Sequence, residues 1–271
     1  MRVIVRAPGP AFRRAISTQP DRNRIDPARA AAQHEAFVRA LRATGCEVVE
    51  LPPDPRLPDA TFVSDAVVAL PAAADPDGAT ELLVVARPAI PSRRPEVRSV
   101  AARARALAPN ARTTSVAAPA TLEGGDVIVF GDRIAIGVSD RTNAAGAAGL
   151  AADARSLGYR AFLCPVGDRL HLATAVTAIG ARRLVGTAAG FSSLEGAGDA
   201  ALTDDVERIV VPDSEWPAAN VLAVGGACLM AAGHPRSATM LREAGEAVLE
   251  VALDEFTRAD GGPTCLVALI P

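Results

Sequence analysis

The 271-residue sequence predicts an α/β fold, a five-bladed and pseudo-symmetric α/β propeller built of ββαβ-type repeats. Two observations support this prediction. A junction recurs along the chain, in which an amphipathic helix ends at a glycine and an apolar strand follows at once. The chain also begins with an isolated strand and ends inside an unfinished unit. The two termini are therefore expected to complete one blade and close the ring.

The helix-to-strand junction is clear at three places and looser at two others. The five junctions follow one another at intervals of roughly fifty residues, which is within the range of repeat architectures. The clear junctions are ALRATGCEVVEL (40–51), ARSLGYRAFLCPV (154–166) and LREAGEAVLEVAL (241–253), and the looser ones are ARALAPNARTTSV (104–116) and TDDVERIVV (203–211).

Pairs of short apolar strands follow the junctions, after polar or proline-rich loops. Several pairs are joined by short polar or glycine-containing turns, as in β-hairpins. The isolated first strand is RVIVRA (2–7), the last unit stops at TCLVALIP (264–271), and the pairs are TFVSDAVVAL (61–70) with ELLVVA (81–86), DVIVF (126–130) with RIAIG (133–137), and NVLAVGG (220–226) with ACLMAA (227–232).

The main structural alternative is an open α/β sheet with antiparallel additions. Neither GxGxxG nor GxxxxGK[ST] follows a strand, so nothing in the sequence indicates the nucleotide site typical of such sheets. Length allows one large domain or two small ones, and 49% hydrophobic residues suffice for a large core. We expect residues 1–271 to form a single domain.

The composition favours a small-molecule partner. The formal net charge is −3 and the arginines are spread along the chain, so neither nucleic acid nor a membrane surface is expected as a partner. No signal peptide or long apolar run is evident, which predicts a cytoplasmic protein. The four cysteines lack CxxC spacing and indicate neither a zinc cluster nor a disulfide framework. We expect no cofactor and no metal.

One cysteine stands apart from the other three. Cys46, Cys164 and Cys228 fall at or within apolar strands, where a thiol usually behaves as a small buried hydrophobe. Cys265 instead follows the turn Gly261–Gly262–Pro263, which delivers it to the start of a strand. Such loop-to-strand positions can face a central cavity.

Among the three histidines, His171 is the best candidate for an acid or base, because it too passes from a polar loop into an apolar segment. His34 has apolar neighbours at helical spacing and is expected to flank the core. His234 lies in a loop before a helix and is expected to be solvated.

Several charged residues occupy matching positions in other repeats. Asp65, Glu123 and Asp126 are embedded among strand-forming residues, where an unpaired carboxylate is costly. Backbone amides or arginines would satisfy any one of them, but several acids around one axis suggest a bound cation. Arg141 opens a helix, where the dipole disfavours a cation unless an anion lies nearby. That anion is either Asp140 or a substrate carboxylate.

Six segments, in this order, resemble the motif series of the dimethylarginine dimethylaminohydrolase family, within the guanidino-group-modifying superfamily. The resemblance covers nearly the whole chain and implies the five-bladed propeller called the pentein fold. Residues 7–18 match the position of the family's mobile lid over the substrate, and the resemblance implies the same role for them here. The segments are FVSD (62–65), ARPAIPSRRPE (86–96), TLEGGD (121–126), DRTNAAG (140–146), HLATAVT (171–177) and GGPTC (261–265).

The resemblance implies a role for individual side chains. Cys265 resembles the nucleophile, His171 the general acid and base, and Glu123 the acid that holds the guanidinium and orients the histidine. The side chains expected to bind the substrate are Asp65 at the guanidinium, Arg87 and Arg141 at the α-carboxylate, Asp59 at the α-amino group, Phe62 along the channel, and Ser64 beside Asp65.

Two departures from related patterns bear on the substrate. The family usually has FVED where this chain has FVSD, so Ser64 removes a negative charge beside the guanidinium pocket. The segment His171–Leu172–Ala173 lacks the aspartate that arginine deiminases carry two residues after the histidine. This argues against plain arginine deimination.

The resemblance implies a cysteine-dependent amidine hydrolase of the dimethylargininase type. It would release dimethylamine or methylamine and citrulline from free N-methylated arginine, through a covalent thiouronium on Cys265. One alternative is a related hydrolase or amidinotransferase acting on arginine or another guanidino compound. Another is a catalytically silent, ligand-binding propeller. Analogy with the family also suggests a possible homodimer.

Overall fold

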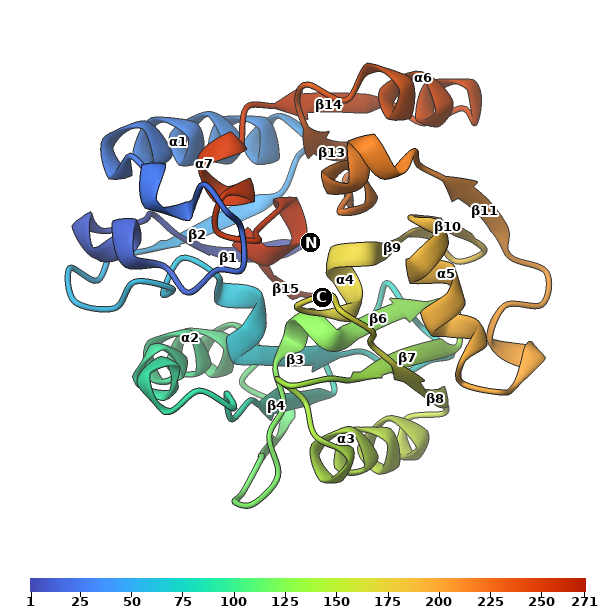
Figure 1. The fold of residues 1–271 in the computed structure, drawn as a ribbon. Coiled ribbons are helices and arrows are strands. Elements are labelled where there is room, and N and C mark those ends of the chain that lie inside the picture. The colour runs from blue at the N-terminus through green and yellow to red at the C-terminus, as the bar shows by residue number, and fades with distance from the viewer.

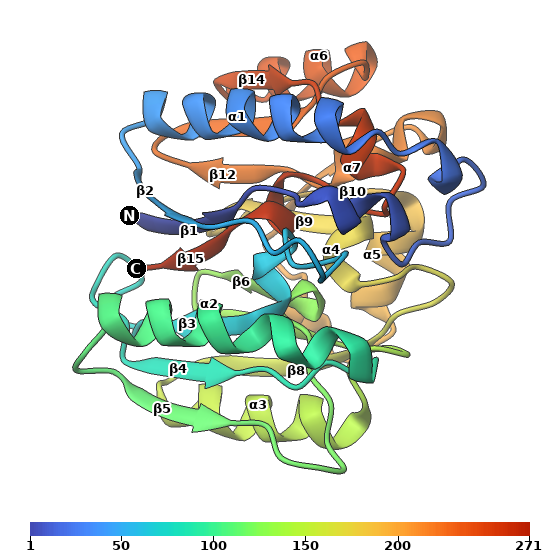
Figure 2. The same ribbon diagram turned by 90° about the vertical axis from the view of Figure 1, so that its left-hand side faces the viewer.

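Five separate three-stranded sheets surround a central axis in the computed structural model, which describes residues 1–271 (Figure 1). The longer helices lie around the outside of this ring, and the ring is seen from the side in Figure 2. The prediction of a five-repeat α/β propeller is confirmed. None of the helices is both long and apolar enough to cross a membrane.

Every blade has the same topology, which the second blade illustrates. Its inner strand β3 (Val67–Leu70) pairs antiparallel with the middle strand β4 (Leu82–Val85). Helix α2 (Arg94–Leu107) then crosses over to the outer strand β5 (Arg112–Ser115), which pairs parallel with β4. The hairpin needs only a short turn, whereas the parallel pair requires a crossover helix.

The three following blades repeat this order, and the hairpins predicted at 126–137 and 220–232 are confirmed. Their elements, together with one short helix before β9, are β6 (Val127–Phe130), β7 (Arg133–Val138), α3 (Ala144–Ser156), β8 (Arg160–Pro165), α4 (Leu172–Ala175), β9 (Val176–Gly180), β10 (Arg183–Gly186), α5 (Ala188–Glu195), β11 (Glu207–Val210), β12 (Leu222–Val224), β13 (Ala227–Ala231), α6 (Pro235–Glu243) and β14 (Val248–Val251).

The two ends of the chain complete the remaining blade, as predicted. Strand β1 (Arg2–Arg6) pairs antiparallel with β15 (Ala268–Ile270) and parallel with β2 (Glu47–Leu51), and the termini lie beside each other (Figures 1 and 2). Helix α1 (Pro27–Ala43) connects β1 to β2, and the short helix α7 (Asp254–Thr257) lies next to α1.

The recurring junction has a local cause that is visible at both ends of α1. Asp26 accepts hydrogen bonds from the backbone N–H groups of Ala28 and Arg29, and Pro27 opens the helix without losing a bond. Beyond the helix, Gly45 has φ +83°, in the left-handed region that favours glycine. Gly158 and Gly245, at φ +91° and +88°, act in the same way before β8 and β14.

Each sheet is apolar on both faces because it separates two packing layers. In β1, Val3 packs with Phe37 of α1, whereas its neighbour Ile4 packs on the opposite side with Val97 and Val100 of α2. Successive strand residues point to opposite faces, so a run of apolar residues fills both layers. The core is therefore divided among five clusters around the ring.

A short helical turn precedes each inner strand, and these five turns lie near one end of the central channel. They cover residues Val63–Ala66, Gly124–Asp126, Leu172–Ala175, Asp213–Ala219 and Pro263–Leu266. The inner strands themselves line an apolar channel with about 890 Å³ of empty space. This arrangement places polar residues of distant segments around one axis.

Candidate active site

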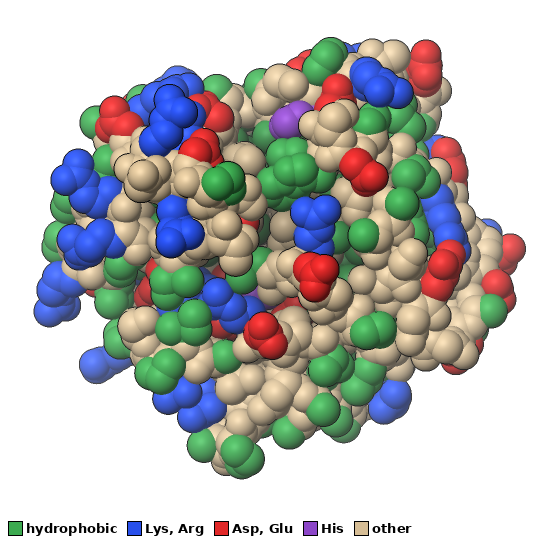
Figure 3. Space-filling view, viewed as in Figure 1, with side chains coloured by type: hydrophobic (Ala, Val, Ile, Leu, Met, Phe, Trp, Pro, Cys, Tyr) green, Lys and Arg blue, Asp and Glu red, His purple; other side chains and the backbone are tan.

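A pocket with about 320 Å³ of empty space lies at the turn-bearing end of the channel. The corresponding face of the molecule carries a hollow near its centre, with acidic and basic side chains around it (Figure 3). The lining residues are Ile16, Asp59, Phe62, Asp65, Arg93, Arg141, Leu170, His171, Ala259, Asp260, Gly261 and Cys265.

Cys265 lies in the turn Pro263–Leu266 immediately before β15. Its backbone N–H donates to the carbonyl of Gly262 at 3.0 Å, and its side chain is half-buried at the pocket wall. Burial, with a contribution from the anionic Asp65, raises the pKa of the thiol to about 11. In the free protein at neutral pH, Cys265 is therefore a thiol.

His171 stands at the start of α4, and its Nε2 lies 2.9 Å from Oε2 of Glu123. Burial alone would lower its pKa, but Asp65, Asp126 and Glu123 outweigh this effect and raise the pKa to about 9. The buried ring is therefore an imidazolium at neutral pH. It can donate a proton.

Glu123 is fully buried at the centre of the polar network. Its Oε2 accepts hydrogen bonds from both His171 and Arg93, the latter at 3.0 Å. Its Oε1 has no hydrogen-bond partner, and the nearest cation, Nη1 of Arg141, is 3.9 Å away. A buried carboxylate oxygen without a partner is costly, so this atom is available to a further donor in the pocket.

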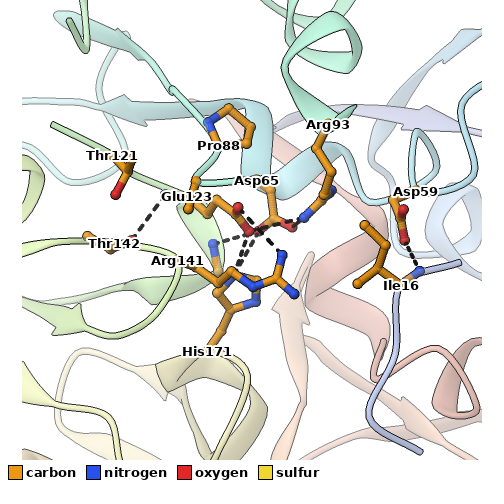
Figure 4. Close-up of polar contacts among 12 residues, drawn as sticks. Ile16, Asp59, Asp65, Pro88, Arg93, Thr121, Glu123, Arg141, Thr142 and His171 are labelled. Carbon is orange, nitrogen blue, oxygen red and sulfur yellow. Dashed lines mark hydrogen bonds and ion pairs between the residues drawn. The ribbon is translucent and has the colours of Figure 1, made fainter. Parts of the chain in front are cut away.

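Asp65 faces Glu123 across a guanidinium group of the protein itself (Figure 4). Its Oδ2 accepts from Nη1 of Arg93 at 3.0 Å, and its Oδ1 accepts from the backbone N–H of Gly125 at 2.9 Å. Although burial favours the neutral acid, His171 and Arg93 lower the pKa of this carboxyl. Asp65 is therefore an anion.

The structure places Arg93 in the pocket instead of Arg87, which corrects the sequence-based expectation. Arg93 immediately precedes α2, and its Nη1 lies between Asp65 and Glu123 while its Nε bonds to Glu96 at 3.2 Å. Arg87 is held elsewhere: its backbone pairs with that of Leu122, and its guanidinium donates to the carbonyl of Ala120. Both arginines belong to the segment 86–96, and spacing alone did not show which of them turns inward.

Besides Asp65, three of the expected substrate contacts line the pocket. Arg141 is 9% exposed, and its closest anion is Glu123 rather than Asp140. Asp59 accepts from the backbone N–H of Ile16, which belongs to the N-terminal segment expected to form a lid. The ring of Phe62 packs against the rest of the pocket wall so closely that a side chain at Gly261 would collide with it.

Ser64 is oriented away from this pocket. Its Oγ donates to the carbonyl of Cys265 at 3.2 Å, and its side chain lines the apolar channel. The expectation that Ser64 borders the guanidinium pocket is therefore not met. It contacts the nucleophile turn instead, because adjacent residues of one short helical turn point in different directions.

Asp126 fixes the segments that carry two of these side chains. Its Oδ1 accepts from the backbone N–H of Leu172, next to His171, and its Oδ2 accepts from Oγ of Ser139. That hydroxyl in turn accepts from the backbone N–H of Arg141. Backbone and hydroxyl donors thus satisfy this buried acid. Burial, the largest influence, raises its pKa.

The remaining cysteines and histidines lie outside the pocket. Cys46, Cys164 and Cys228 are buried, as expected for small hydrophobes. His34 is 1% exposed within α1, where burial lowers its pKa to about 4. His234 is half-buried at the start of α6, and so less solvated than expected.

The same group of residues offers ligands that could hold a metal ion. One side-chain ligand atom each from Asp65, Glu123 and His171 lies within 4.8 Å of the others. However, the guanidinium of Arg93 already bonds to both carboxylates, and the pair of oxygens matches the planar donors of such a group. The site is built to hold a guanidinium.

Five blades around a pocket with a cysteine, a protonated histidine and two carboxylates define the class of guanidino-group-modifying α/β propellers. Comparison with known proteins identifies the family within this class. The model of the family described as "N,N dimethylarginine dimethylhydrolase, eukaryotic" matches residues 7–189. The chain belongs to the dimethylarginine dimethylaminohydrolase family, whose members are hydrolases.

Bacterial relatives match over nearly their full lengths. The N(G),N(G)-dimethylarginine dimethylaminohydrolase of Streptomyces coelicolor is 35% identical over 269 residues, covering 98% of this chain and 95% of the relative. The protein of the same name from Pseudomonas aeruginosa is 31% identical over 241 residues, covering 89% and 88%.

Solved structures agree with this assignment. A mutant of the Pseudomonas aeruginosa enzyme in complex with citrulline superimposes with a TM-score of 0.86 at 28% identity, covering 98% of this chain and 97% of the other. The N-terminal domain of a cyanobacterial arginine dihydrolase gives 0.81 at 18% identity, covering 98% and 97%, and thus shares the fold.

Proposed function

We propose that this chain hydrolyses the guanidinium group of free N-methylated arginine and releases citrulline with dimethylamine or methylamine. The observation that carries this proposal is the guanidinium of Arg93, held between Asp65 and Glu123 next to His171 and Cys265. A pocket that binds a guanidinium of its own protein suits a substrate with the same group.

The substrate guanidinium takes the place of Nη1 of Arg93 between the two carboxylates. It also supplies a donor to the unpartnered Oε1 of Glu123. A carboxylate about 4 Å from a cation contributes roughly 4 kcal/mol at an effective dielectric of 20, before desolvation is subtracted. The two acids hold the plane of the group, so that its carbon faces the nucleophile.

The other end of the substrate is an amino acid, and the pocket wall carries matching charges. Arg93, once displaced from between the acids, and Arg141 are the two cations available to the α-carboxylate. Asp59 is the acid available to the α-amino group, and Phe62 covers the apolar stem. Arg93 therefore takes the part that the sequence had suggested for Arg87.

In the first half of the reaction, the cationic substrate favours ionisation of the Cys265 thiol, whose proton passes to solvent. The thiolate attacks the guanidinium carbon and forms a C–S bond. His171, already an imidazolium, protonates the departing nitrogen as the C–N bond breaks. Neutral amine leaves, and an S-alkylthiouronium remains on Cys265.

In the second half, water replaces the amine above the same carbon. His171, now neutral, accepts one proton from this water as the new C–O bond forms, and the C–S bond breaks to return the thiolate. The second proton of the water passes to solvent as the C=O of citrulline forms. Glu123 orients the ring throughout, since its Oε2 lies 2.9 Å from Nε2. The products sum to citrulline and one amine per water consumed.

The preferred nitrogen substituent is a separate question, because Ser64 stands where the family usually has a glutamate. Ser64 places no negative charge beside the guanidinium and contacts the Cys265 turn. The sequence difference therefore lies at the Cys265 turn and not in the pocket wall, and the substrate panel below also tests another guanidino substrate and transfer to an amine acceptor.

A substrate panel tests the proposal. The protein is incubated with asymmetric dimethylarginine, monomethylarginine or arginine, with and without an added amine acceptor, and citrulline is measured. We expect citrulline from the methylated substrates and none from Cys265→Ser. Turnover of arginine alone would contradict the proposed substrate, and transfer to the acceptor would contradict hydrolysis. Inactivity of the wild type towards all three substrates would refute the proposed function.

Three expectations about the protein as a whole remain predictions. We infer one domain over residues 1–271, since β1 and β15 from opposite ends share a blade. We also infer a cytoplasmic protein and a homodimer, the latter by analogy with the family. Resistance to limited proteolysis tests the first, cell fractionation the second, and size-exclusion chromatography with light scattering the third.

A further inference from the structure

The candidate site draws on all five repeats, and one of its members is not accounted for by the proposed chemistry. Asp65, Glu123, His171 and Cys265 lie at or beside the short turns that precede four of the inner strands. In the remaining repeat this place belongs to Asn220, which ends the turn Asp213–Ala219 just before β12. Asn220 is 4% exposed.

The side chain of Asn220 connects the segment of the histidine to that of the cysteine. Its Nδ2 donates to the carbonyl of Ala173 at 2.9 Å, and Ala173 is two residues beyond His171. The same nitrogen donates to Oγ1 of Thr264 at 2.8 Å and lies 3.8 Å from Sγ of Cys265. Its Oδ1 accepts from the backbone N–H of Thr264 at 2.9 Å.

The chemistry of these partners fixes which way the amide faces. A backbone N–H can only donate, so the atom next to the Thr264 nitrogen must be the amide oxygen. A backbone carbonyl can only accept, so the atom next to Ala173 must be the amide nitrogen. The nitrogen has two N–H groups: Ala173 accepts from one, and the other is directed at the Thr264 hydroxyl and the sulfur of Cys265, which lie 2.8 and 3.8 Å from it. The amide orientation therefore follows from its partners.

The nucleophile turn is shaped to admit this side chain. A Cβ atom at Gly262 would lie 2.6 Å from Cγ and 2.7 Å from Oδ1 of Asn220, closer than real contacts allow. Gly262 has an extended backbone that any residue adopts, so the position requires glycine for space and not for conformation. The turn carrying Cys265 therefore packs directly on the amide.

We propose that Asn220 is the positioning residue of the nucleophile, which holds the Cys265 turn against the His171 segment and donates a hydrogen bond to the sulfur once it becomes a thiolate. This rests on the function proposed above. A neutral donor suits the task, because it stabilises the anion without competing for the substrate guanidinium. In agreement, the hydrogen bond from Asn220 lowers the pKa of Cys265, although burial dominates and raises it overall.

The test measures the thiol without requiring turnover. Cys265 is alkylated by iodoacetamide over a range of pH, the peptide that contains it is quantified by mass spectrometry, and Cys265→Ser serves as the blank. In Asn220→Asp the amide donor is lost and an anion is added, whereas the acceptor for Thr264 is kept. In Asn220→Ser the amide is replaced, without added charge, by a single hydroxyl one bond nearer the backbone, which cannot contact both Ala173 and the Cys265 turn. The matched control is Asn110→Asp in an exposed turn.

We expect the alkylation profile of both Asn220 variants to shift to higher pH, more in Asn220→Asp than in Asn220→Ser. We also expect kcat to fall by about 10- to 100-fold, as for loss of a hydrogen bond to a charged group, while KM changes less. Asn110→Asp should match the wild type. An unchanged alkylation profile in either folded Asn220 variant would overturn the proposal, whether or not methylarginine proves to be the substrate. If the wild type is inactive towards methylarginines but the alkylation profile still shifts in the variants, only the proposed substrate is refuted.

Discussion

The two ends of the central channel are made by the same five chain segments, yet they differ completely in character. At one end, the turns before the inner strands gather Asp65, Glu123, His171 and Cys265 around a guanidinium. At the other, the strands that continue from those turns present an almost wholly apolar wall. The difference shows that the chemistry depends on the turns, whereas the strands supply the support that positions them.

Gly125 lies at the boundary between these two ends. A Cβ atom there would come within 2.7 Å of Nδ1 of His171 and 2.8 Å of Oδ1 of Asp65. Because its N–H also bonds to Asp65, this residue brings backbone directly against both functional side chains. A close approach of this kind needs glycine. The polar end is therefore more tightly constrained than the apolar end.

The largest effect is expected from Glu123→Gln at the polar end. It removes the anion that helps to raise the pKa of His171 to about 9 and that holds the guanidinium. We expect kcat/KM to fall by about 10³-fold, within the range for losing an oriented general acid. In the wild type, kcat/KM should rise with pH as the thiol ionises and level off at about pH 9, where the imidazolium is lost, and in the variant this break should move to lower pH. A pH profile of kcat/KM checks both, and an unmoved break would contradict the role of Glu123.

A smaller effect, on KM, should distinguish Arg93 from Arg87 in the same segment. Arg93→Lys should raise KM by about 10- to 100-fold, because lysine cannot reproduce the planar donors that face a carboxylate. Arg87→Lys is the matched control, since Arg87 only donates to the carbonyl of Ala120 outside the pocket. We expect it to leave KM within about threefold. Steady-state kinetics of both variants decide which arginine serves the substrate, and equal effects would remove the distinction drawn from the structure.

The apolar end should affect stability without affecting chemistry. Leu70 of β3 is 1% exposed and lines the channel. Leu70→Ala should lower the free energy of unfolding by about 2–5 kcal/mol. We expect kcat, measured well below the melting temperature, to stay within about threefold of the wild type. Urea denaturation and kinetics test this, and a large loss of kcat with little loss of stability would contradict the division between the two ends.

The last comparison is between two buried histidines, and it concerns the pH dependence of stability. His34 lies among apolar residues and has its pKa lowered to about 4, whereas His171 lies among acids and has its pKa raised to about 9. A lowered pKa means that the unfolded chain binds the proton more readily. Stability from His34 is thus complete above pH 6.5 and lost as the pH falls towards 4, by about 3 kcal/mol. We expect urea denaturation of His34→Leu to show a flatter dependence between pH 7 and 4.5, and an identical slope would refute this.

The architecture was predictable because its signals are local and repeated. A helix followed by a strand recurs at the five junctions, and at the three clear ones Gly45, Gly158 and Gly245 have the left-handed conformation that such an ending requires. The closure of the ring by both termini followed from the isolated first strand and the unfinished last unit. These features depend on neighbours in sequence, which is why the sequence alone sufficed.

The side-chain geometry of the site was predictable only in part. Asp65, Glu123, His171 and Cys265 converge as expected because each lies beside a similar turn. The choice between Arg87 and Arg93 depends on which way a side chain leaves a nonrepetitive segment, and this is decided by the distant acids that Arg93 reaches.

The positions of the Ser64 and Asn220 side chains were harder still to predict from the sequence. Ser64 points along the channel because Asp65, one residue later in the same turn, occupies the pocket direction. Asn220 resembles an ordinary turn residue in the sequence. The signal that could have found it is its position, since it precedes an inner strand just as the other four functional segments do.

The proposed reaction passes through a covalent intermediate on Cys265, which rapid quenching followed by mass spectrometry can detect. The protein is mixed with excess asymmetric dimethylarginine, quenched with acid after a fraction of a turnover, and analysed intact and as peptides. We expect an adduct with the mass of the substrate minus dimethylamine, confined to the Cys265 peptide and absent from Cys265→Ser. Citrulline formed without any such adduct, or formed equally by Cys265→Ser, would contradict it.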